Sequence, residues 1–167
     1  MLNLAVSLDG FTEGPNGEFD WCFTDQDYGM MGFMNRKDAI FIGRKSYELV
    51  LQMGKHPDSD KLKYVFSKTI NNVKGNTKLI SQNIEEEVKS IIDQEGKDIW
   101  LFGGANIVTS FLNSGLVDEI HLAVHPIILG KGKPLFEEIK KRKYFKLIDT
   151  ITYSSGLVQL FYQTDKK

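Results

Sequence analysis

Two short apolar runs that each end in glycine constrain the fold of this 167-residue chain more than any other feature. Residues 40–42 are followed by Gly43, and residues 99–102 are followed by Gly103 and Gly104. Neither run alternates with polar residues, which is typical of parallel strands covered on both faces. A stretch with helical spacing follows each glycine, so the pattern indicates two β-to-α junctions.

The rest of the chain alternates in the same way. Strands are predicted over residues 2–8, 38–42, 62–66, 77–80, 98–102 and 117–125, and helices over 24–36, from 44 onward, over 84–93 and over 105–112. Residues 144–153 and 157–163 read as an antiparallel hairpin, and residues 9–20 as a long loop. This order predicts one α/β domain over residues 1–167. We expect a mixed, mostly parallel central sheet with helices on both faces and an antiparallel C-terminal hairpin.

Composition and charge narrow the class of protein. Hydrophobic residues make up 41% of the chain and charged residues 26%, as in ordinary globular proteins. A formal net charge of −1 provides no field that would draw the chain to nucleic acid or to an anionic membrane. No apolar run approaches the roughly twenty residues of a membrane span, and the single cysteine allows no intrachain disulfide. We therefore expect a cytoplasmic protein that acts on a small molecule, and leave open whether it forms a homodimer.

Both junctions offer groups that bind anions. Free amides at a helix N-terminus favour phosphate, and glycine lets the backbone approach a ligand closely. Two such sites on neighbouring strands suggest a dinucleotide, although no Gly-x-Gly-x-x-Gly or Gly-x₄-Gly-Lys-Ser/Thr motif is present. The alternative is that the glycines only end strands and the cations are solvated. The candidate residues are Gly43, Arg44, Lys45, Ser46, Gly103, Gly104, Ala105 and Asn106.

Five segments, taken in order, resemble the signature of the reductase C-terminal domain of riboflavin biosynthesis, within the dihydrofolate-reductase-like superfamily. They are residues 7–10 (Ser-Leu-Asp-Gly), 43–48 (Gly-Arg-Lys-Ser-Tyr-Glu), 102–105 (Phe-Gly-Gly-Ala), 115–119 (Gly-Leu-Val-Asp-Glu) and 126–136 (Pro-x₃-Gly-x-Gly-x-Pro-Leu-Phe). The resemblance spans most of the chain. It implies a dihydrofolate-reductase-like fold and NADPH as the cofactor.

The resemblance also implies roles for individual residues. Residues 43–46 would bind the phosphates on the adenosine side of NADPH, and residues 103–106 would receive the pyrophosphate. Ser67 and Lys68 match the place where that family holds the extra 2′-phosphate, although they could also be a plain polar strand end. Cationic side chains in these segments would offer charge-assisted hydrogen bonds to a phosphomonoester.

Two aspartates are candidate catalytic residues. Asp9 ends the first predicted strand and opens the long loop, where a rigid element presents a polar group beneath a mobile cover. Its alternative role is a plain Asp-Gly turn. Asp27 falls near the place of the helix-borne acid that follows a tryptophan in dihydrofolate reductases, and the tryptophan here is Trp21. The stretch after Trp21 lacks the Leu-Pro usual before that acid, so folate reduction is the lesser interpretation.

These observations predict an NADPH-dependent reductase that transfers hydride to a small heterocyclic or imine-like substrate. The resemblance is to 5-amino-6-(5-phosphoribosylamino)uracil reductase. A dihydrofolate reductase proper and an NADPH-binding module without turnover are the alternatives. His121 and His125 share one face of a predicted strand, but no His-Glu-x-x-His sequence is present and the only cysteine is far away in sequence, so no metal site is expected.

Overall fold

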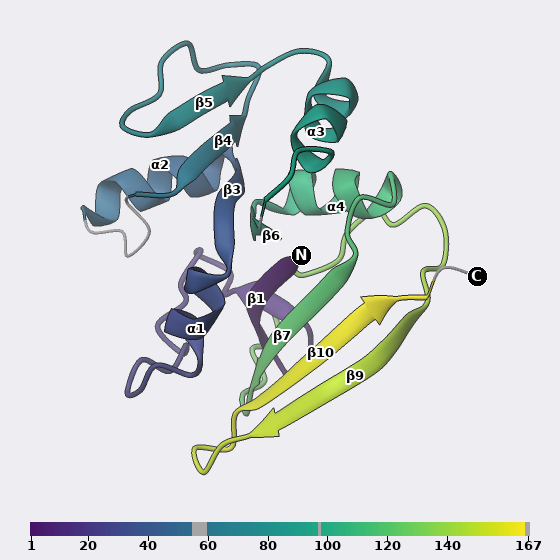
Figure 1. The fold of residues 1–167 in the computed structure, drawn as a ribbon. Coiled ribbons are helices and arrows are strands. Elements are labelled where there is room, and N and C mark those ends of the chain that lie inside the picture. The colour runs from purple at the N-terminus through teal and green to yellow at the C-terminus, as the bar shows by residue number, and fades with distance from the viewer. Residues whose placement is uncertain (55–59, 97, 166–167) are drawn as a thin grey trace. The chain divides into compact units, whose positions relative to one another are not determined.

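The computed structural model describes residues 1–54, 60–96 and 98–165 (Figure 1). By their internal contacts these residues divide into two units. Residues 28–107 form what we call the central unit, and residues 1–27 together with 108–167 form the terminal unit. No helix in the described ranges is long and apolar enough to cross a membrane.

The central unit is built on four parallel strands. Their order across the sheet is β5-β4-β3-β6. The strands are β3 Lys37–Gly43, β4 Leu62–Phe66, β5 Thr77–Ile80 and β6 Asp98–Gly103. The helices are α1 Met30–Asn35, α2 Arg44–Met53 and α3 Ile84–Ile92, and α4 Ala105–Asn113 begins in this unit. The predicted strands at 62–66 and 77–80 are confirmed to the residue.

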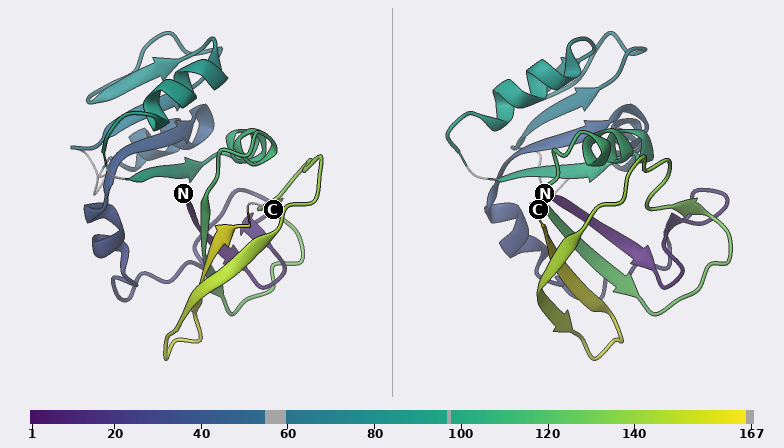
Figure 2. Two further views of the ribbon diagram at one scale, coloured as in Figure 1. Left: turned by 45° about the vertical axis from the view of Figure 1, so that its right-hand side comes forward. Right: turned by 90° about the vertical axis from the view of Figure 1, so that its right-hand side faces the viewer.

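Helices α2 and α3 lie on opposite faces of this sheet. The connection through α2 leads from β3 to β4, and the connection through α3 leads from β5 to β6, in the opposite direction across the sheet. Because β-α-β crossovers are right-handed, opposite directions place the two helices on opposite faces, as the ribbon views show (Figure 1 and Figure 2). This coverage explains why Ile40, Phe41 and Ile42 are all buried.

The terminal unit holds a four-stranded mixed sheet and a small two-stranded one. Its strands are β1 Leu2–Ser7, β2 Phe11–Glu13, β7 Glu119–His125, β8 Lys133–Pro134, β9 Phe145–Thr152 and β10 Val158–Thr164. The order is β1-β7-β10-β9, with β1 parallel to β7 and the remaining pairs antiparallel. The hairpin of β9 and β10 confirms the predicted antiparallel C-terminal edge. Strand β2 lies within residues 9–20, which were predicted to be a loop, and it pairs with β8.

The helix predicted over residues 24–36 is wrong in its first half. Helix α1 starts at Met30, because Tyr28 and Gly29 both adopt positive φ angles, 49° and 75°, which a right-handed helix cannot contain. Asp25 and Asp27 therefore lie in an irregular, exposed stretch before the helix rather than on it. A first-turn helix-dipole interaction is not available to either carboxylate.

A buried ion pair joins the amino ends of β3 and β6. The Lys37 side chain is 0% exposed, and its Nζ donates a hydrogen bond to Asp98 Oδ2 over 2.8 Å while lying 4.6 Å from the Phe33 ring centre. The hydrogen bond from Lys37 holds the pKa of Asp98 below its usual value of 3.8. Since the Asp98 side chain is 51% exposed, water can solvate the carboxylate but not the ammonium.

This asymmetry predicts unequal effects of removing the two partners. Asp98→Ala removes the carboxylate that compensates a buried ammonium and should lower the free energy of unfolding by about 2 kcal/mol or more. Lys37→Met keeps the apolar stem and leaves a carboxylate that water can reach, so the loss should stay within about 1 kcal/mol. Urea unfolding at pH 7 measures both values, and a larger loss in Lys37→Met would contradict the proposed asymmetry.

Candidate functional site

The carboxyl ends of three strands meet at one edge of the central unit. In the parallel ladders Gly43 lies opposite Phe66 of β4, and Ile42 lies opposite Gly103 of β6. The two glycine junctions predicted from the sequence are therefore on adjacent strands, as expected. Ser67 follows β4 directly, so the third predicted segment lies at the same edge.

The backbones of Gly43 and Gly104 approach each other closely. A Cβ atom on Gly104 would lie 3.4 Å from Gly43 Cα and 3.6 Å from Ser46 Oγ, so a side chain there would enter the space between the starts of α2 and α4. A Cβ on Gly43 would lie 3.3 Å from the Gly103 carbonyl oxygen. Gly104 also has a φ of 97°, a conformation that residues with side chains rarely adopt. The two glycines thus keep side chains out of a space between two helix N-termini, which Ile107 Cγ2 and Ser46 Oγ also border.

Cationic and polar residues follow the strands that end at this edge. Arg44 donates two hydrogen bonds from Nη1 to the Glu48 carboxylate, at 2.8 and 3.0 Å, along one turn of α2. Both side chains are more than a third exposed, so this pair is a weak one that a bound anion can compete with. Lys45 and Lys68 are exposed, as is Asn106 in the first turn of α4.

The Ser67 hydroxyl shapes the loop after β4. Its Oγ accepts hydrogen bonds from the amides of Thr69 and Ile70, at 3.1 and 3.2 Å, and the side chain is buried. Ser67 therefore fixes a turn that presents Lys68 to solvent beside the end of β3. Ser67 thus stabilises the loop after β4. Its contact with a phosphate stays a prediction.

A second group of polar side chains lies at the carboxyl ends of β1 and β7 in the terminal unit. Asp9 accepts hydrogen bonds from Ser7 Oγ at 2.7 Å and from the amides of Leu129 and Gly130 at 3.1 and 2.7 Å. These bonds, that from Ser7 foremost, lower the pKa of Asp9 below its usual value of 3.8. Asp9 is thus an ionised carboxylate that holds the 129–130 loop.

His125 lies opposite Ser7 in the ladder and organises an aromatic cluster. Its ring makes edge contacts with Trp21 and Phe23, with ring centres 5.2 and 5.1 Å apart. The Phe23 amide donates to Nε2 at 3.1 Å, while Nδ1 lies 3.0 Å from the Ala123 carbonyl oxygen. Since an amide can only donate and a carbonyl can only accept, His125 must be neutral with its proton on Nδ1. Burial lowers its pKa in the same sense.

The neighbours of His125 add two further observations. Within the described residues, Trp21 Nε1 is the one buried side-chain nitrogen or oxygen that lacks a hydrogen-bond partner. An orphaned buried donor is costly, which suggests that it meets an acceptor on a ligand or a water. Burial raises the pKa of the Cys22 thiol to about 11, so this cysteine stays protonated and is a poor nucleophile.

Sequence reasoning placed neither Trp21 nor His125 among the site residues. His125 was considered only as a metal ligand with His121, and the described residues contain no group of three potential ligands. The sequence signal for His125 was its position at the end of a predicted strand. Once that strand pairs in parallel with β1, His125 lies opposite Ser7. Asp27, by contrast, was predicted to be catalytic and lies exposed in the irregular stretch before α1.

Comparison with known proteins identifies the family. A family model described as the RibD C-terminal domain matches residues 1–159. The chain belongs to the RibD C-terminal domain family. YyaP, an uncharacterized protein of Bacillus subtilis (strain 168), is 47% identical to it over 97% of this chain and 93% of its own length. The resemblance noted in the sequence is thereby confirmed.

Solved structures carry the same fold. A Shewanella sp. PV-4 protein, provisionally named a riboflavin biosynthesis protein, superposes with a TM-score of 0.88 at 25% identity and covers 99% of this chain and 98% of its own. A Thermotoga maritima diaminohydroxyphosphoribosylaminopyrimidine deaminase/5-amino-6-(5-phosphoribosylamino)uracil reductase gives 0.74 at 15% identity, over 98% of this chain and 56% of its own. These matches confirm the predicted dihydrofolate-reductase-like α/β fold. The RibD C-terminal domain is a reductase domain, which is consistent with an oxidoreductase.

The neutral state of His125 predicts a pH dependence of stability. Its pKa in the folded protein lies below the usual value of 6.5, so the unfolded chain takes up the proton first as the pH falls. The stabilisation is therefore complete above about pH 6.5 and is lost as the pH falls through the folded-state pKa. In His125→Gln, whose amide oxygen can still accept from Phe23, the part of the pH slope that His125 contributes should vanish. Unfolding of both proteins between pH 7.5 and 5 checks this, and parallel curves would contradict it.

Proposed function

We propose that this protein is an NADPH-dependent reductase that transfers hydride to a small heterocyclic or imine-like substrate. The observation that carries the proposal is the close approach of Gly43 and Gly104, which brings two glycine-preceded helix N-termini to one sheet edge. Membership in a reductase-domain family supports the same reaction class. The Thermotoga maritima protein of the same fold, a uracil-derivative reductase by name, suggests a pyrimidine-like acceptor.

The residues at this edge fit a dinucleotide. Backbone amides in the first turns of α2 and α4 would hold phosphate oxygens, and the space that a Gly104 side chain would fill is available to the pyrophosphate. Arg44, Lys45 and Lys68 would surround a terminal phosphomonoester with charge-assisted donors. A 2′-phosphate is the group that separates NADPH from NADH, so these cations favour NADPH.

In the proposed reaction the reduced nicotinamide of the cofactor supplies the hydride, and side chains of the protein bind and orient the substrate. Within the terminal unit, the Trp21 indole N–H is a buried donor ready for an acceptor oxygen or nitrogen of a ligand, and the ring of His125 contacts that indole. Asp9 and Asp27 are the proposed catalytic residues. The hydrogen bonds and lowered pKa of Asp9 favour a role in orienting the substrate or holding the 129–130 loop over one in donating a proton.

Cofactor selectivity tests the proposed phosphate site. NADPH should bind at least about tenfold more tightly than NADH, since each charge-assisted hydrogen bond to the 2′-phosphate contributes about 1.5–3 kcal/mol. Lys68→Ala should weaken NADPH binding and leave NADH binding nearly unchanged. Gly104→Val should abolish binding of both by filling the space between the two helices. Isothermal titration calorimetry of the three proteins with each cofactor gives these affinities.

A matched glycine separates site loss from backbone strain. Gly54, at the other end of α2, also has a positive φ, of 70°, and a Cβ there would meet nothing within 4 Å. Gly54→Val should therefore lose stability through strain and still bind NADPH. Equal affinities of the parent for NADPH and NADH would remove the 2′-phosphate site. If Gly104→Val still binds NADPH, then Gly103 and Gly104 only form a turn and do not make room for the cofactor.

Asp9→Asn tests the proposed catalytic role. The change keeps the size of the side chain but removes its charge, so the Ser7, Leu129 and Gly130 bonds weaken. NADPH affinity should stay within about threefold, because the proposed phosphate-binding residues lie elsewhere in the sequence. Turnover should fall by roughly 10²-fold, the scale of a lost substrate-orienting or acid–base group. NADPH oxidation is followed with the acceptor that the parent reduces fastest from a panel of heterocycles and imines. Unchanged turnover in Asp9→Asn, with a loss in Asp27→Asn, would transfer the role to Asp27.

A further inference from the structure

The connection between β4 and β5, which the structure describes throughout, contains no helix and carries Lys68. Because the two strands are parallel neighbours, residues 67–76 return from the carboxyl edge of the sheet to its amino edge. Such a crossover usually takes about a dozen residues or more and a helix. We call this shorter segment the β4–β5 loop. Most of its residues are exposed, so its position depends on a small number of hydrogen bonds.

Sheet hydrogen bonds fix the two ends of the β4–β5 loop. At the carboxyl edge the Ser67 amide donates to the Ile80 carbonyl at 3.1 Å, and the Ser67 hydroxyl stabilises the turn that presents Lys68. At the amino edge the Lys63 amide donates to the Asn76 carbonyl at 3.0 Å. The backbone between these two ends has to be placed by other contacts.

A buried tyrosine of α2 holds the second half of the β4–β5 loop. The Lys74 amide donates a hydrogen bond to the Tyr47 hydroxyl oxygen at 2.7 Å, across 27 positions of the chain. Tyr47 is 3% exposed, whereas Lys74 is exposed, so the tyrosine is the rigid partner of this pair. Thr77 Oγ1 donates to the Lys74 carbonyl, also at 2.7 Å, so both backbone groups of Lys74 are bonded.

The handedness of the sheet explains why α2 and the β4–β5 loop meet. The connection from β3 to β4 through α2 and the connection from β4 to β5 cross the sheet in the same direction. Since crossovers between parallel strands are right-handed, both connections lie on the same face of the sheet. The loop that carries Lys68 therefore runs beside the helix whose first turn belongs to the candidate cofactor site.

We propose that Tyr47 is a positioning residue that sets the selectivity for the 2′-phosphate of the cofactor. The inference rests on the proposed NADPH site, in which Arg44 and Lys45 begin α2 and Lys68 lies on the β4–β5 loop. Tyr47 is the fourth residue of α2, so its bond to Lys74 ties the helix turn with two of these cations to the loop with the third. Tyr47 acts through the position of Lys68.

An anchored loop lowers the cost of binding a phosphate. A lysine on a loop that is free at one end loses more conformational freedom when it meets the ligand. Tyr47→Phe keeps the aromatic ring and removes only the oxygen atom that accepts from Lys74. Water can solvate the exposed Lys74 instead, so the change should loosen the loop with little loss of stability.

A double-mutant cycle tests the proposal. The parent, Tyr47→Phe, Lys68→Ala and the double variant are titrated with NADPH and with NADH in a calorimeter. Tyr47→Phe should weaken NADPH binding about three- to tenfold, the range for one hydrogen bond. It should change NADH binding by less than about twofold. In the Lys68→Ala background its effect on NADPH should also fall below about twofold, because residues that act through one another are not additive.

Hydrogen exchange without cofactor reports on the anchor itself. The Lys74 amide should exchange at least about tenfold faster in Tyr47→Phe, while the amides of β4 keep the protection they have in the parent. Thr77→Val releases the Lys74 carbonyl without changing α2. This second variant should lower the preference for NADPH in the same direction.

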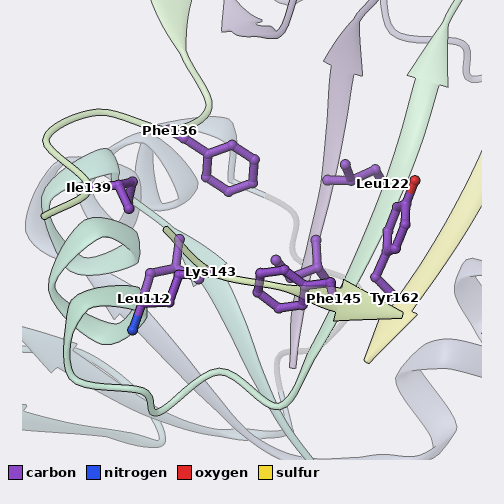
Figure 3. Close-up of a pocket in the computed structure, with 8 residues that line it drawn as sticks. Leu112, Leu122, Phe136, Ile139, Lys143, Phe145 and Tyr162 are labelled. Atoms are coloured by element: carbon purple, nitrogen blue, oxygen red, sulfur yellow. The ribbon is translucent and has the colours of Figure 1, made fainter. Parts of the chain in front are cut away.

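The matched control removes a tyrosine hydroxyl from the terminal unit. Tyr162 of β10 lines an apolar hollow of about 300 Å³ that lies within that unit (Figure 3). Tyr162→Phe should leave unchanged both the ratio of the two cofactor affinities and the exchange rate at Lys74. Circular dichroism melts verify that every variant is folded.

The outcomes separate this inference from the site on which it rests. Equal affinities of the parent for NADPH and NADH remove the 2′-phosphate site and the inference with it. If the parent prefers NADPH, the inference alone is overturned when Tyr47→Phe keeps that preference, weakens NADH equally, or adds its full effect to that of Lys68→Ala. An unchanged exchange rate at Lys74, or the same losses in Tyr162→Phe, overturns it as well.

Discussion

The parallel pairing of β3 with β4 on one side and β6 on the other is the constraint on which the candidate cofactor site depends. Parallel strands bring their carboxyl ends to one edge, so Ser67, Gly43 and Gly103 reach it together. The next requirement is close approach. Gly43 and Gly104 meet backbone to backbone, and any larger residue would fill the space between two helix N-termini. The ladder and the glycines together form the candidate anion site, which contains no Rossmann or P-loop motif.

The two ends of the same strands have opposite electrostatic requirements. At the amino ends Lys37 pairs with Asp98, and a half-exposed carboxylate of the protein compensates the buried ammonium. At the carboxyl ends the amides at the start of α2 have no side-chain cap, and Lys45 and Lys68 are exposed. Stability is thus provided away from the edge that would bind a ligand. The amides at the start of α2 keep hydrogen-bonding capacity that a charged ligand could use.

In the terminal unit, local sequence and distant partners combine. Asp9 followed by Gly10 reads as a turn, and Gly10 indeed donates its amide to the Ser7 carbonyl. The same carboxylate also holds the amides of Leu129 and Gly130, 120 and 121 residues away. His125 likewise accepts from Phe23 across 102 positions. Through these contacts Asp9 holds the 129–130 loop and His125 holds the backbone at Phe23.

The sequence by itself determined the order of the helices and the longer strands, the bounds of those strands to within two residues, and both glycine junctions, because apolar periodicity and glycine act over a few neighbouring residues. It also carried enough ordered motifs to indicate the family. Only the tertiary structure decided where α1 begins, since the positive φ angles of Tyr28 and Gly29 leave no periodic signal. It alone revealed the buried Lys37, the orphaned Trp21 indole and the partners of Asp9 and His125. Such features arise when segments far apart in the chain meet, and a contact of that kind depends on both segments at once.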